Sequence, residues 1–342
     1  MTKQLNITSK ETLPWIEKYR PSTLDEIISH SVIIDTLNNF IKYNELPHLL
    51  FHGPPGSGKS SVVIAVAKAL YKDKFDIMTM EINASEERGI EVVRNRIIQF
   101  ANSKSLSFDD DDEQKNTFKL IILDEADAMT SDAQASLRRV IEKYTRNVRF
   151  CLICNYIKKI DIAIQSRCTC FRFAPLKDIY IKERLYDIAE KEYVKYTDDG
   201  LDTIVKRSKG DMRKVLNILQ SVSMAYEEVN ENNVDKCLGY PCGSDILLIL
   251  KNLISQNFTD SYSLLKDYKE THGFSLSDII VEIHEYLIDI LLKKSKYPDI
   301  NLTNKQIQEI IKYLGKIDYN IANATDETIQ FAAFVGVFKM IL

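Results

Sequence analysis

Short apolar runs alternate with segments of helical periodicity over the first half of the chain. The runs have the length and composition of buried strands and comprise residues 48–51, 79–82, 120–123 and 149–154. The segments between them repeat apolar residues at helical spacing and comprise residues 61–70, 90–100 and 131–144, the last capped near Thr130 or Ser131. This alternation through Phe173 predicts an α/β fold with a parallel sheet that is covered on both faces.

The pattern changes after Pro175, where strand signals almost vanish. Residues 181–193, 201–206 and 212–219 indicate helices of a small helical lid. A second change comes at Gly239-Tyr-Pro-Cys-Gly243, beyond which the periodicity is helical to the last residue. We therefore predict three domains, which are an α/β core at 1–175, an all-α lid at 176–238 and an all-α domain at 239–342.

A glycine-rich loop lies between the first predicted strand and its helix. It has the sequence GPPGSGKS at residues 53–60 and consists of Gly53, Pro54, Pro55, Gly56, Ser57, Gly58, Lys59 and Ser60, with Ser61 following. Such a loop wraps backbone N–H groups around a polyphosphate, while its lysine reaches the β- and γ-phosphates and its last hydroxyl faces Mg²⁺. A chance glycine turn rarely has a strand before it and a helix after it. The loop therefore predicts a site for ATP and Mg²⁺.

A pair of acids follows the strand at 120–123 and supplies a second half for this site. Asp124 is expected near the Mg²⁺ shell, and Glu125 where it polarises the attacking water. Taken alone, the pair has an equally good explanation as solvated acids at the end of a buried strand. Together with the glycine-rich loop it predicts hydrolysis of ATP and not only binding.

Composition narrows the class of protein. With 342 residues and 45% hydrophobic residues, the chain is long enough for two or three domains. No apolar run approaches the ~18 residues of a membrane span, and the N-terminus lacks a secretory pattern, so we expect an intracellular, soluble protein. The net charge of −4 is partly concentrated in residues 109–113, which indicate a solvated loop. A charge of this size does not exclude DNA binding, because a local basic surface is sufficient.

Cysteines raise the alternative of a metal site. Cys151 and Cys154 have the CxxC spacing, and Cys168 and Cys170 follow closely. However, residues 149–154 indicate a strand, in which residues three apart point to opposite faces. We therefore favour reduced cysteines packed in a core over a zinc site.

Nine motifs in one order give the chain a specific resemblance. They are WIEKYRP (15–21), LPHLL (46–50), the loop at 53–60, NAS (83–85), LDEAD (123–127), LRRV (137–140), NY (155–156), SRC (166–168) and GDMR (210–213). In these motifs the chain resembles the small subunits of eukaryotic replication factor C, the AAA+ sliding-clamp loader. ISH (28–30), DAM (127–129) and CLICNY (151–156) most resemble the branch that is numbered five in animals and three in fungi. The resemblance implies a P-loop AAA+ core, a lid and a helical collar that mediates oligomerisation.

The resemblance also implies roles for residues that spacing alone does not interpret. Asn155 is similar to sensor 1, which orients the hydrolytic water or the γ-phosphate, and Arg213 is similar to sensor 2, which reaches the γ-phosphate from the lid. Arg167 is similar to an arginine finger, which acts on the ATP of a neighbouring subunit. By pattern alone these residues are a strand-end asparagine and two surface arginines.

Further implied contacts concern the base and the DNA. Ile16, Arg20 and Ile28 are implied on the adenine side, although periodicity places both isoleucines in a core. The implied contacts with the DNA backbone are Arg88, Arg94 and Lys159, for which ordinary solvated charge is the alternative.

The implied function is that of a nuclear ATPase subunit of a hetero-pentameric clamp loader. Its partners would be other replication factor C subunits, the ring-shaped clamp and primer–template DNA, without a membrane. Two alternatives stay open, which are an ATP-binding scaffold with little hydrolysis and a self-sufficient AAA+ motor such as a helicase. Intact Lys59, Glu125 and Arg167 argue against the scaffold, and the SRC motif argues against the homo-hexameric motor.

Overall fold

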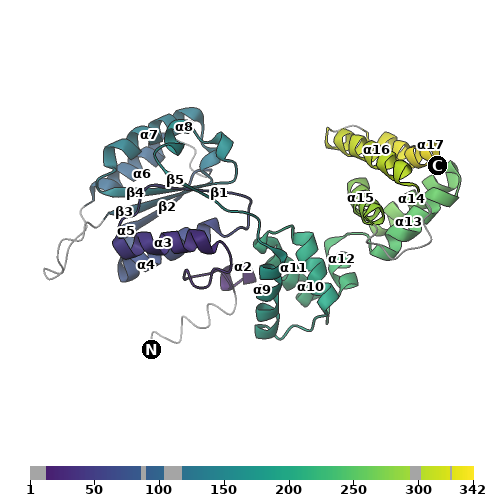
Figure 1. Cartoon of the computed structure of the whole chain (residues 1–342), viewed down its shortest axis with the longest axis horizontal. Helices are drawn as coiled ribbons and strands as arrows, with labels where there is room; N and C mark the ends of the chain where they lie inside the picture. The colour runs from purple at the N-terminus through teal and green to yellow at the C-terminus, as the bar shows by residue number, and fades with distance from the viewer. Residues whose placement is uncertain (1–12, 86–89, 104–117, 293–301, 324–325) are drawn as a thin grey trace. The chain divides into compact units, whose positions relative to one another are not determined.

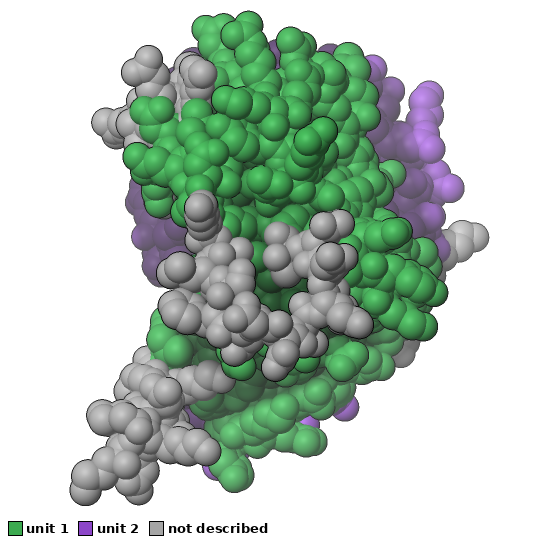
Figure 2. All heavy atoms as spheres, turned by 90° about the vertical axis from the view of Figure 1, so that its left-hand side faces the viewer, with its two compact units in different colours: residues 1–194, 204–220 green, residues 195–203, 221–342 purple. Residues whose placement is uncertain are grey.

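The computed structural model describes residues 13–85, 90–103, 118–292, 302–323 and 326–342 (Figure 1). The chain divides into two compact units, coloured separately in Figure 2. Unit 1 comprises residues 1–194 and 204–220, and unit 2 comprises residues 195–203 and 221–342. The segment expected as the lid contributes to both, with α9 (Asp178–Lys191) in unit 1 and α12 (Glu231–Leu238) in unit 2.

A five-stranded parallel sheet forms the centre of unit 1. Its strands are β1 (Leu49–His52), β2 (Thr79–Asn83), β3 (Lys119–Asp124), β4 (Val148–Cys154) and β5 (Thr169–Arg172). They lie in the order β2-β3-β4-β1-β5, and every neighbouring pair is parallel. The predicted α/β fold with a parallel sheet is therefore confirmed. The loops that follow β1, β3 and β4 meet at one edge of the sheet, which is where α/β proteins bind ligands.

Helices cover both faces of this sheet, as the sequence predicts. Figure 1 shows α3 (Ser31–Tyr43) and α4 (Lys59–Tyr71) on one face, and α6 (Ile90–Asn102), α7 (Ser131–Tyr144) and α8 (Ile162–Gln165) on the other. Alternate residues of each strand enter different cores. Leu120 and Ile122 pack with Val62 of α4, whereas Ile121 and Leu123 pack with helices of the opposite face. The continuous apolar runs are thus explained by burial on both sides.

Cys151 and Cys154 lie in β4 and face opposite cores. Cys151 packs with the cluster that contains Phe51, and Cys154 packs with the cluster that contains Phe150. Burial raises the pKa of the Cys154 thiol to about 12, so the thiol stays protonated at neutral pH. Both cysteines therefore act as small apolar core residues, as the strand interpretation predicts.

A buried histidine joins β1 to β4 at the amino-terminal end of the sheet. The Phe150 N–H donates to Nδ1 of His48 at 3.1 Å, and Nε2 of His48 lies 3.4 Å from the Thr145 hydroxyl oxygen. Since that hydroxyl donates to the Ile141 carbonyl, Nε2 carries the proton of a neutral imidazole. Burial, aided by the nearby Arg149 guanidinium, lowers the pKa of His48 to about 4.

The helices that follow the sheet begin with α9, and α10 (Asp198–Ser208) and α11 (Met212–Ala225) come next. The carboxylate of Asp211 accepts hydrogen bonds from the N–H groups of Arg213 at 2.9 Å and Lys214 at 3.4 Å. This side chain satisfies two of the first backbone donors of α11 and fixes where the helix begins. Arg213 is consequently held in the first helical turn.

Unit 2 is built from helices, in agreement with the predicted helical C-terminal part. After α12 come α13 (Gly243–Ser255), α14 (Phe258–His272), α15 (Leu276–Leu291), α16 (Asn304–Ala322) and α17 (Glu327–Ile341). They share an aliphatic and aromatic core that includes Ile249, Ile283 and Phe334. No single helix among the described residues is long and apolar enough to cross a membrane. The bent pair of α12 and α13 has the length and composition of a membrane span, and length and composition are all that suggest one.

Candidate nucleotide-binding site

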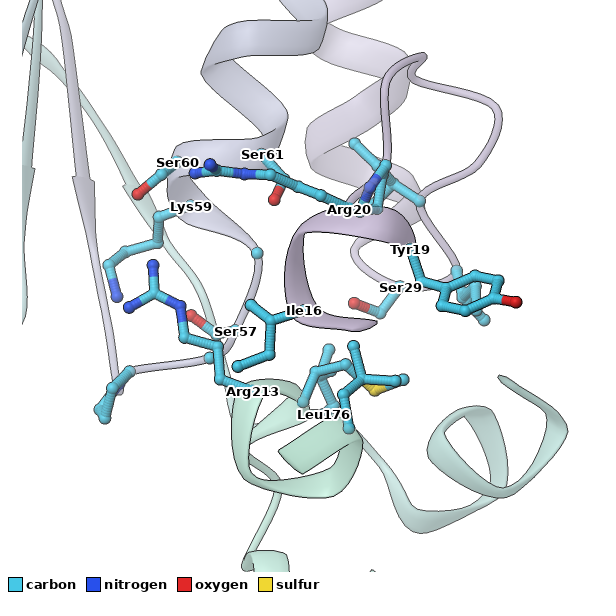
Figure 3. Close-up of a pocket in the computed structure, with 18 of the residues that line it drawn as sticks. Ile16, Tyr19, Arg20, Ser29, Ser57, Lys59, Ser60, Ser61, Leu176 and Arg213 are labelled. Carbon is cyan, nitrogen blue, oxygen red and sulfur yellow. The ribbon is translucent and has the colours of Figure 1, made fainter. Parts of the chain in front are cut away.

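A cavity of about 400 Å³ lies in unit 1 at the carboxyl edge of the sheet (Figure 3). Its walls come from the N-terminal segment, the loop after β1, the ends of β2, β3 and β4, and helices α9 and α11. The cavity brings together most of the residues that the sequence predicts for nucleotide binding. They are Ile16, Arg20, Ile28, Pro55, Gly56, Ser57, Gly58, Lys59, Ser60, Ser61, Asp124, Glu125, Asn155 and Arg213.

The glycine-rich loop turns directly from β1 into α4. Gly56 and Gly58 have φ angles of 67° and 93°, which lie in the left-handed region that favours glycine. Gly58 is the N-cap of α4, so the first N–H groups of this helix lie at the cavity. Backbone donors at a helix N-terminus form a site for an anion, and a phosphate is the anion that this loop geometry suits.

Lys59 is the most constrained side chain of this loop. It is buried, and its Nζ donates to the carbonyls of Gly53 and Pro54 at 2.8 Å each and to Oδ1 of Asn155 at 3.1 Å. Gly53 and Pro54 therefore position the lysine through their carbonyl groups. Burial lowers the pKa of Lys59; the Asp124 carboxylate opposes this shift, and the Arg213 guanidinium adds to it. All three ammonium hydrogens are engaged, so a phosphate that binds Lys59 has to replace at least one of these partners.

Ser60 and Asp124 form a pair of oxygen ligands beside the lysine. The Ser60 hydroxyl donates to Oδ2 of Asp124 at 2.9 Å, which joins the first turn of α4 to the end of β3. A hydroxyl and a carboxylate are ligands that Mg²⁺ accepts, and Mg²⁺ usually keeps several waters and takes its other ligands from phosphates. The donor set of this pair thus fits a nucleotide-bound Mg²⁺ ion.

Glu125 has an unusual backbone conformation for its residue type. Its φ angle is 54°, in the left-handed region, and its N–H donates to Oδ1 of Asp124 at 2.8 Å. A non-glycine residue in this region is strained, and such strain clusters at functional sites. The side chain is exposed and lines the cavity, where it is accessible to a water molecule.

Asn155 ends β4 next to the end of β3. Besides accepting from Lys59, it is followed by Tyr156, whose N–H donates to Oδ2 of Asp127 at 3.1 Å. This bond ties the loop after β4 to the loop after β3. The hydrogen bond from Lys59 and the neighbouring bond from Tyr156 to Asp127 therefore hold Asn155 at this edge of the sheet.

The first turn of α11 contacts the glycine-rich loop. A Cβ atom on Gly56 would lie 1.8 Å from Oδ1 of Asp211, and the Met212 N–H donates to the Gly56 carbonyl at 3.3 Å. Glycine at position 56 is thus required for this close approach as well as for its φ angle. In Figure 3 the guanidinium of Arg213 lies close to the ammonium of Lys59. The lid helix therefore brings a second positive charge to the phosphate end of the cavity.

The opposite end of the cavity is lined by the N-terminal segment and by α9. Ile16 and Ile28 line the cavity, and so do Tyr19, Glu26, Tyr180 and Arg184, for which the sequence predicts no role. The side chain of Arg20 extends toward Ser60 and Ser61 in Figure 3, so its guanidinium lies near the phosphate end. Tyr19 belongs to the WIEKYRP motif, so a signal for it was present in the sequence. Helical periodicity in α9 gave no signal for Tyr180 or Arg184, because facing the cavity depends on how α9 packs.

The remaining predicted residues do not line this cavity. Arg167 is exposed and forms an ion pair with Glu142 at 2.7 Å and a hydrogen bond to the Ala163 carbonyl at 2.6 Å. Lys159 is exposed, with Nζ 5.3 Å from the centre of the Tyr156 ring. Arg88 and the side chain of Arg94 lie outside the described residues.

Three family models match the chain in the order of its elements. They are the ATPase family associated with various cellular activities (AAA) at residues 49–176, the RCF1/5-like AAA+ ATPase lid domain at 183–224 and the replication factor C C-terminal domain at 241–337. Among solved structures, the RuvB Holliday junction branch migration motor of Thermotoga maritima is similar with a TM-score of 0.51. It is 17% identical and matches 77% of this chain and 91% of its own, a likeness that concerns the fold.

Curated relatives match nearly the whole chain. Replication factor C subunit 5 of Homo sapiens is 45% identical over 334 residues, which cover 97% of this chain and 93% of that protein. Replication factor C subunit 3 of Schizosaccharomyces pombe is 42% identical over 339 residues, which cover 99% and 94%. With these matches and the AAA+ fold in place, the chain belongs to the replication factor C small subunits, in the branch numbered five in animals and three in fungi.

Proposed function

We propose that this chain is an ATPase subunit of a five-membered clamp loader, which opens a ring-shaped sliding clamp and loads it onto primer–template DNA in the nucleus. The observation that carries the proposal is the convergence of Lys59, Asp124, Glu125 and Asn155 with the lid residue Arg213 in one cavity. A chain that only bound nucleotide would not need a strained acid beside a pair of Mg²⁺ ligands.

The chemistry follows from where these side chains lie. The loop N–H groups and Lys59 bind the phosphates. Ser60 and Asp124 would hold Mg²⁺, which would supply positive charge against the phosphate oxygens. Glu125 polarises the attacking water and Asn155 orients it. Arg213 contacts the γ-phosphate from α11, so the presence of ATP favours one position of the lid.

Arg167 serves the ATP site of a neighbouring subunit, and the site of this chain receives a finger from another neighbour. Arg167 is exposed and lies outside the cavity, which is consistent with a role at a neighbouring site. An arginine supplied in trans is worth about 10³–10⁵ in rate, so the isolated chain should hydrolyse ATP slowly. In the assembly, ATP binding would arrange the subunits for clamp opening, and hydrolysis would release the closed clamp. In this proposal, residues 1–175 form the nucleotide-binding core, residues 176–238 form the lid and residues 239–342 form the collar that mediates oligomerisation.

The test is ATP turnover by the isolated chain and by the chain assembled with partner subunits, each with and without clamp and primed DNA. We expect strong stimulation on assembly, and we expect Arg167→Ala to remove most of it. Arg146→Ala is a matched control, because Arg146 is also an exposed arginine of unit 1. Equal turnover in isolation and in the assembly would overturn the shared-site model, and no turnover in any mixture would favour the ATP-binding scaffold.

Contacts with the DNA backbone remain a separate part of the proposal. Arg88, Arg94 and Lys159 are its candidates, and of these the described side chain is Lys159. If Lys159 contacts a phosphate, Lys159→Gln should lower by about one the slope of the logarithm of DNA affinity against the logarithm of salt concentration. The affinity for every DNA sequence should fall by a similar factor. An unchanged slope would remove Lys159 from the DNA surface.

A further inference from the structure

The segment that lines the base end of the cavity is bound to lid helices. The backbone N–H of Trp15 donates to Oε1 of Gln220 in α11 at 3.1 Å, and the guanidinium of Arg184 in α9 donates to the Tyr19 carbonyl at 3.3 Å. Within this segment, α2 (Trp15–Lys18) is a single helical turn. A turn of this length is not stable alone in water, so its position depends on such contacts.

Two side chains of the segment converge on one carboxylate. The hydroxyl of Tyr19 donates to Oε1 of Glu192, and Nζ of Lys18 forms an ion pair with the same oxygen at 2.5 Å. The Lys18 and Glu192 side chains are 25% and 16% exposed, so this pair is shielded more than an ordinary surface ion pair. In Figure 3 the Tyr19 hydroxyl points away from Lys59, whereas the Tyr19 residue itself lines the cavity.

The location of Glu192 is unfavourable for its own helix. It is the C-cap residue of α9, where the negative end of the helix dipole repels a carboxylate. Burial opposes its ionisation as well, yet the hydrogen bonds from Lys18 and Tyr19, together with the Lys18 charge, outweigh the effect of burial and lower the pKa of Glu192. The Glu192 carboxylate therefore stabilises the position of the N-terminal segment and does not stabilise α9.

We propose that Glu192 is a positioning residue for the nucleoside of ATP, because it anchors residues 15–20 to the lid so that Ile16 faces the base. The inference rests on the proposed nucleotide binding and adds a specific consequence. The base contact of Ile16 moves with the lid, whereas the phosphate contacts stay with the sheet and the loop after β1, except for that of Arg213 in α11. Loss of the anchor should therefore weaken recognition of the nucleoside and leave recognition of the phosphates intact.

The experiment compares two ligands on the full-length chain. ATP carries both the nucleoside and the phosphates, and inorganic tripolyphosphate carries the phosphates alone. For Glu192→Gln we expect the affinity for ATP to fall about 10-fold and the affinity for tripolyphosphate to change less than twofold. In the assembled complex, the KM for ATP should rise while kcat stays within twofold.

Two further variants keep the result interpretable. Tyr19→Phe removes one partner of Glu192 and keeps the ring, so its effect on ATP affinity should not add to that of Glu192→Gln. Glu190→Gln is the matched control, because Glu190 is an exposed glutamate of the same helix. It should change neither affinity.

Three outcomes with the variants would overturn the inference. They are an unchanged ATP affinity in Glu192→Gln, an equal loss of ATP and tripolyphosphate affinity, and full additivity with Tyr19→Phe. If the wild-type chain bound tripolyphosphate as tightly as ATP, the nucleoside would have no recognised site and the inference would also fail. If the wild-type chain bound neither ligand, the proposed nucleotide-binding function would fail first.

Discussion

The two ends of the cavity are built by different means. At the phosphate end, Asp124 ends β3, Asn155 directly follows β4, and Lys59 begins α4 after the loop that follows β1. Parallel pairing of these three strands brings the residues together. At the base end, the N-terminal segment is held by side chains from α9 and α11, which lie 173 and 205 residues away along the chain. The phosphate end thus depends mainly on the sheet, with Arg213 of α11 as its contribution from the lid, whereas the base end depends on the lid.

This difference teaches which changes should affect chemistry and which should affect affinity. The sheet is a rigid support, so a change at its carboxyl edge alters the reacting groups directly. The lid contacts are a small set of polar interactions at partly buried positions, each worth about 0.5–1.5 kcal/mol. Perturbing them should move the nucleoside without removing a reacting group.

The largest effect is expected from Lys59→Met at the phosphate end. Removing one charged donor from a preorganised site costs about 10²–10³ in turnover. Steady-state ATP hydrolysis by the assembled complex measures the loss. Lys68→Met on the exposed side of the same helix is the control and should retain wild-type turnover. A loss confined to ATP affinity, with kcat preserved, would break the distinction between the two ends.

Acidic pH should weaken the sheet that supports the phosphate end. Burial and the Arg149 guanidinium lower the pKa of His48 to about 4 in the folded protein, from 6.5 when unfolded. A group whose pKa is lower in the folded state stabilises the fold above its unfolded pKa and loses that contribution as pH falls. We therefore expect the free energy of unfolding of unit 1 to fall by up to about 2–3 kcal/mol between pH 6.5 and pH 4.

Denaturant titrations at several pH values measure the change in the free energy of unfolding. Proton NMR of the His48 imidazole shows whether this histidine causes the change. His30 and His52 also have lowered pKa values because of burial, and they add to the trend in the same direction. The resonances of His48 should not titrate above pH 5.5. A midpoint near 6.5 for His48 would contradict the prediction.

Gly56→Ala should push Asp211 and the start of α11 away from the glycine-rich loop. The new Cβ would lie 1.8 Å from Oδ1 and 2.9 Å from Cα of Asp211, at a φ angle of 67°. Gly273→Ala is the control for backbone strain, because Gly273 has a φ angle of 73° and nothing within 4 Å of its Cβ position. We expect the control to cost about 1 kcal/mol and Gly56→Ala to cost about 1–2 kcal/mol more in unfolding free energy. Equal costs would mean that α11 moves aside without penalty.

The smallest effect is expected from Gln220→Ala at the base end. It removes the acceptor of the Trp15 N–H, a loss of about 1 kcal/mol, which corresponds to about a fivefold weaker affinity for ATP. Competition with a fluorescent nucleotide measures this change, and affinity for tripolyphosphate should stay constant. Asn217→Ala, at an exposed position of the same helix, is the control. A change in kcat would show that the base end also shapes the reacting geometry.

Much of the fold could be predicted from the sequence because its signals are local. The four predicted strands and the α/β class agree with the structure. Of the two predicted caps for the helix at 131–144, Thr130 is the one that the structure shows, and its hydroxyl oxygen accepts from the Ala133 N–H at 3.3 Å. The strand Thr169–Arg172 was not delimited, since most of it is exposed at an edge and lacks an apolar run. A strand whose residues are mostly exposed gives a weak signal because it has few apolar positions to bury.

The phosphate end was accessible from sequence for the same reason. A glycine-rich loop, the acids after β3 and the asparagine after β4 each lie next to a recognisable strand, and parallel pairing then fixes their proximity. The partners of Lys59 show the limit of this reasoning. That its ammonium binds the Gly53 and Pro54 carbonyls depends on the path of the loop in three dimensions.

The class of fold, the loop and the acids of the phosphate end, and the family could all be predicted from local patterns, because strand periodicity and a contiguous loop are short-range properties of the backbone. Tertiary structure alone decided that Glu192 and Gln220 hold the base end, that Asp211 lies against Gly56, and that Glu142 pairs with Arg167. Each of these contacts joins residues that are distant in sequence. Side-chain pairing of this kind depends on how whole helices pack, which no local pattern encodes.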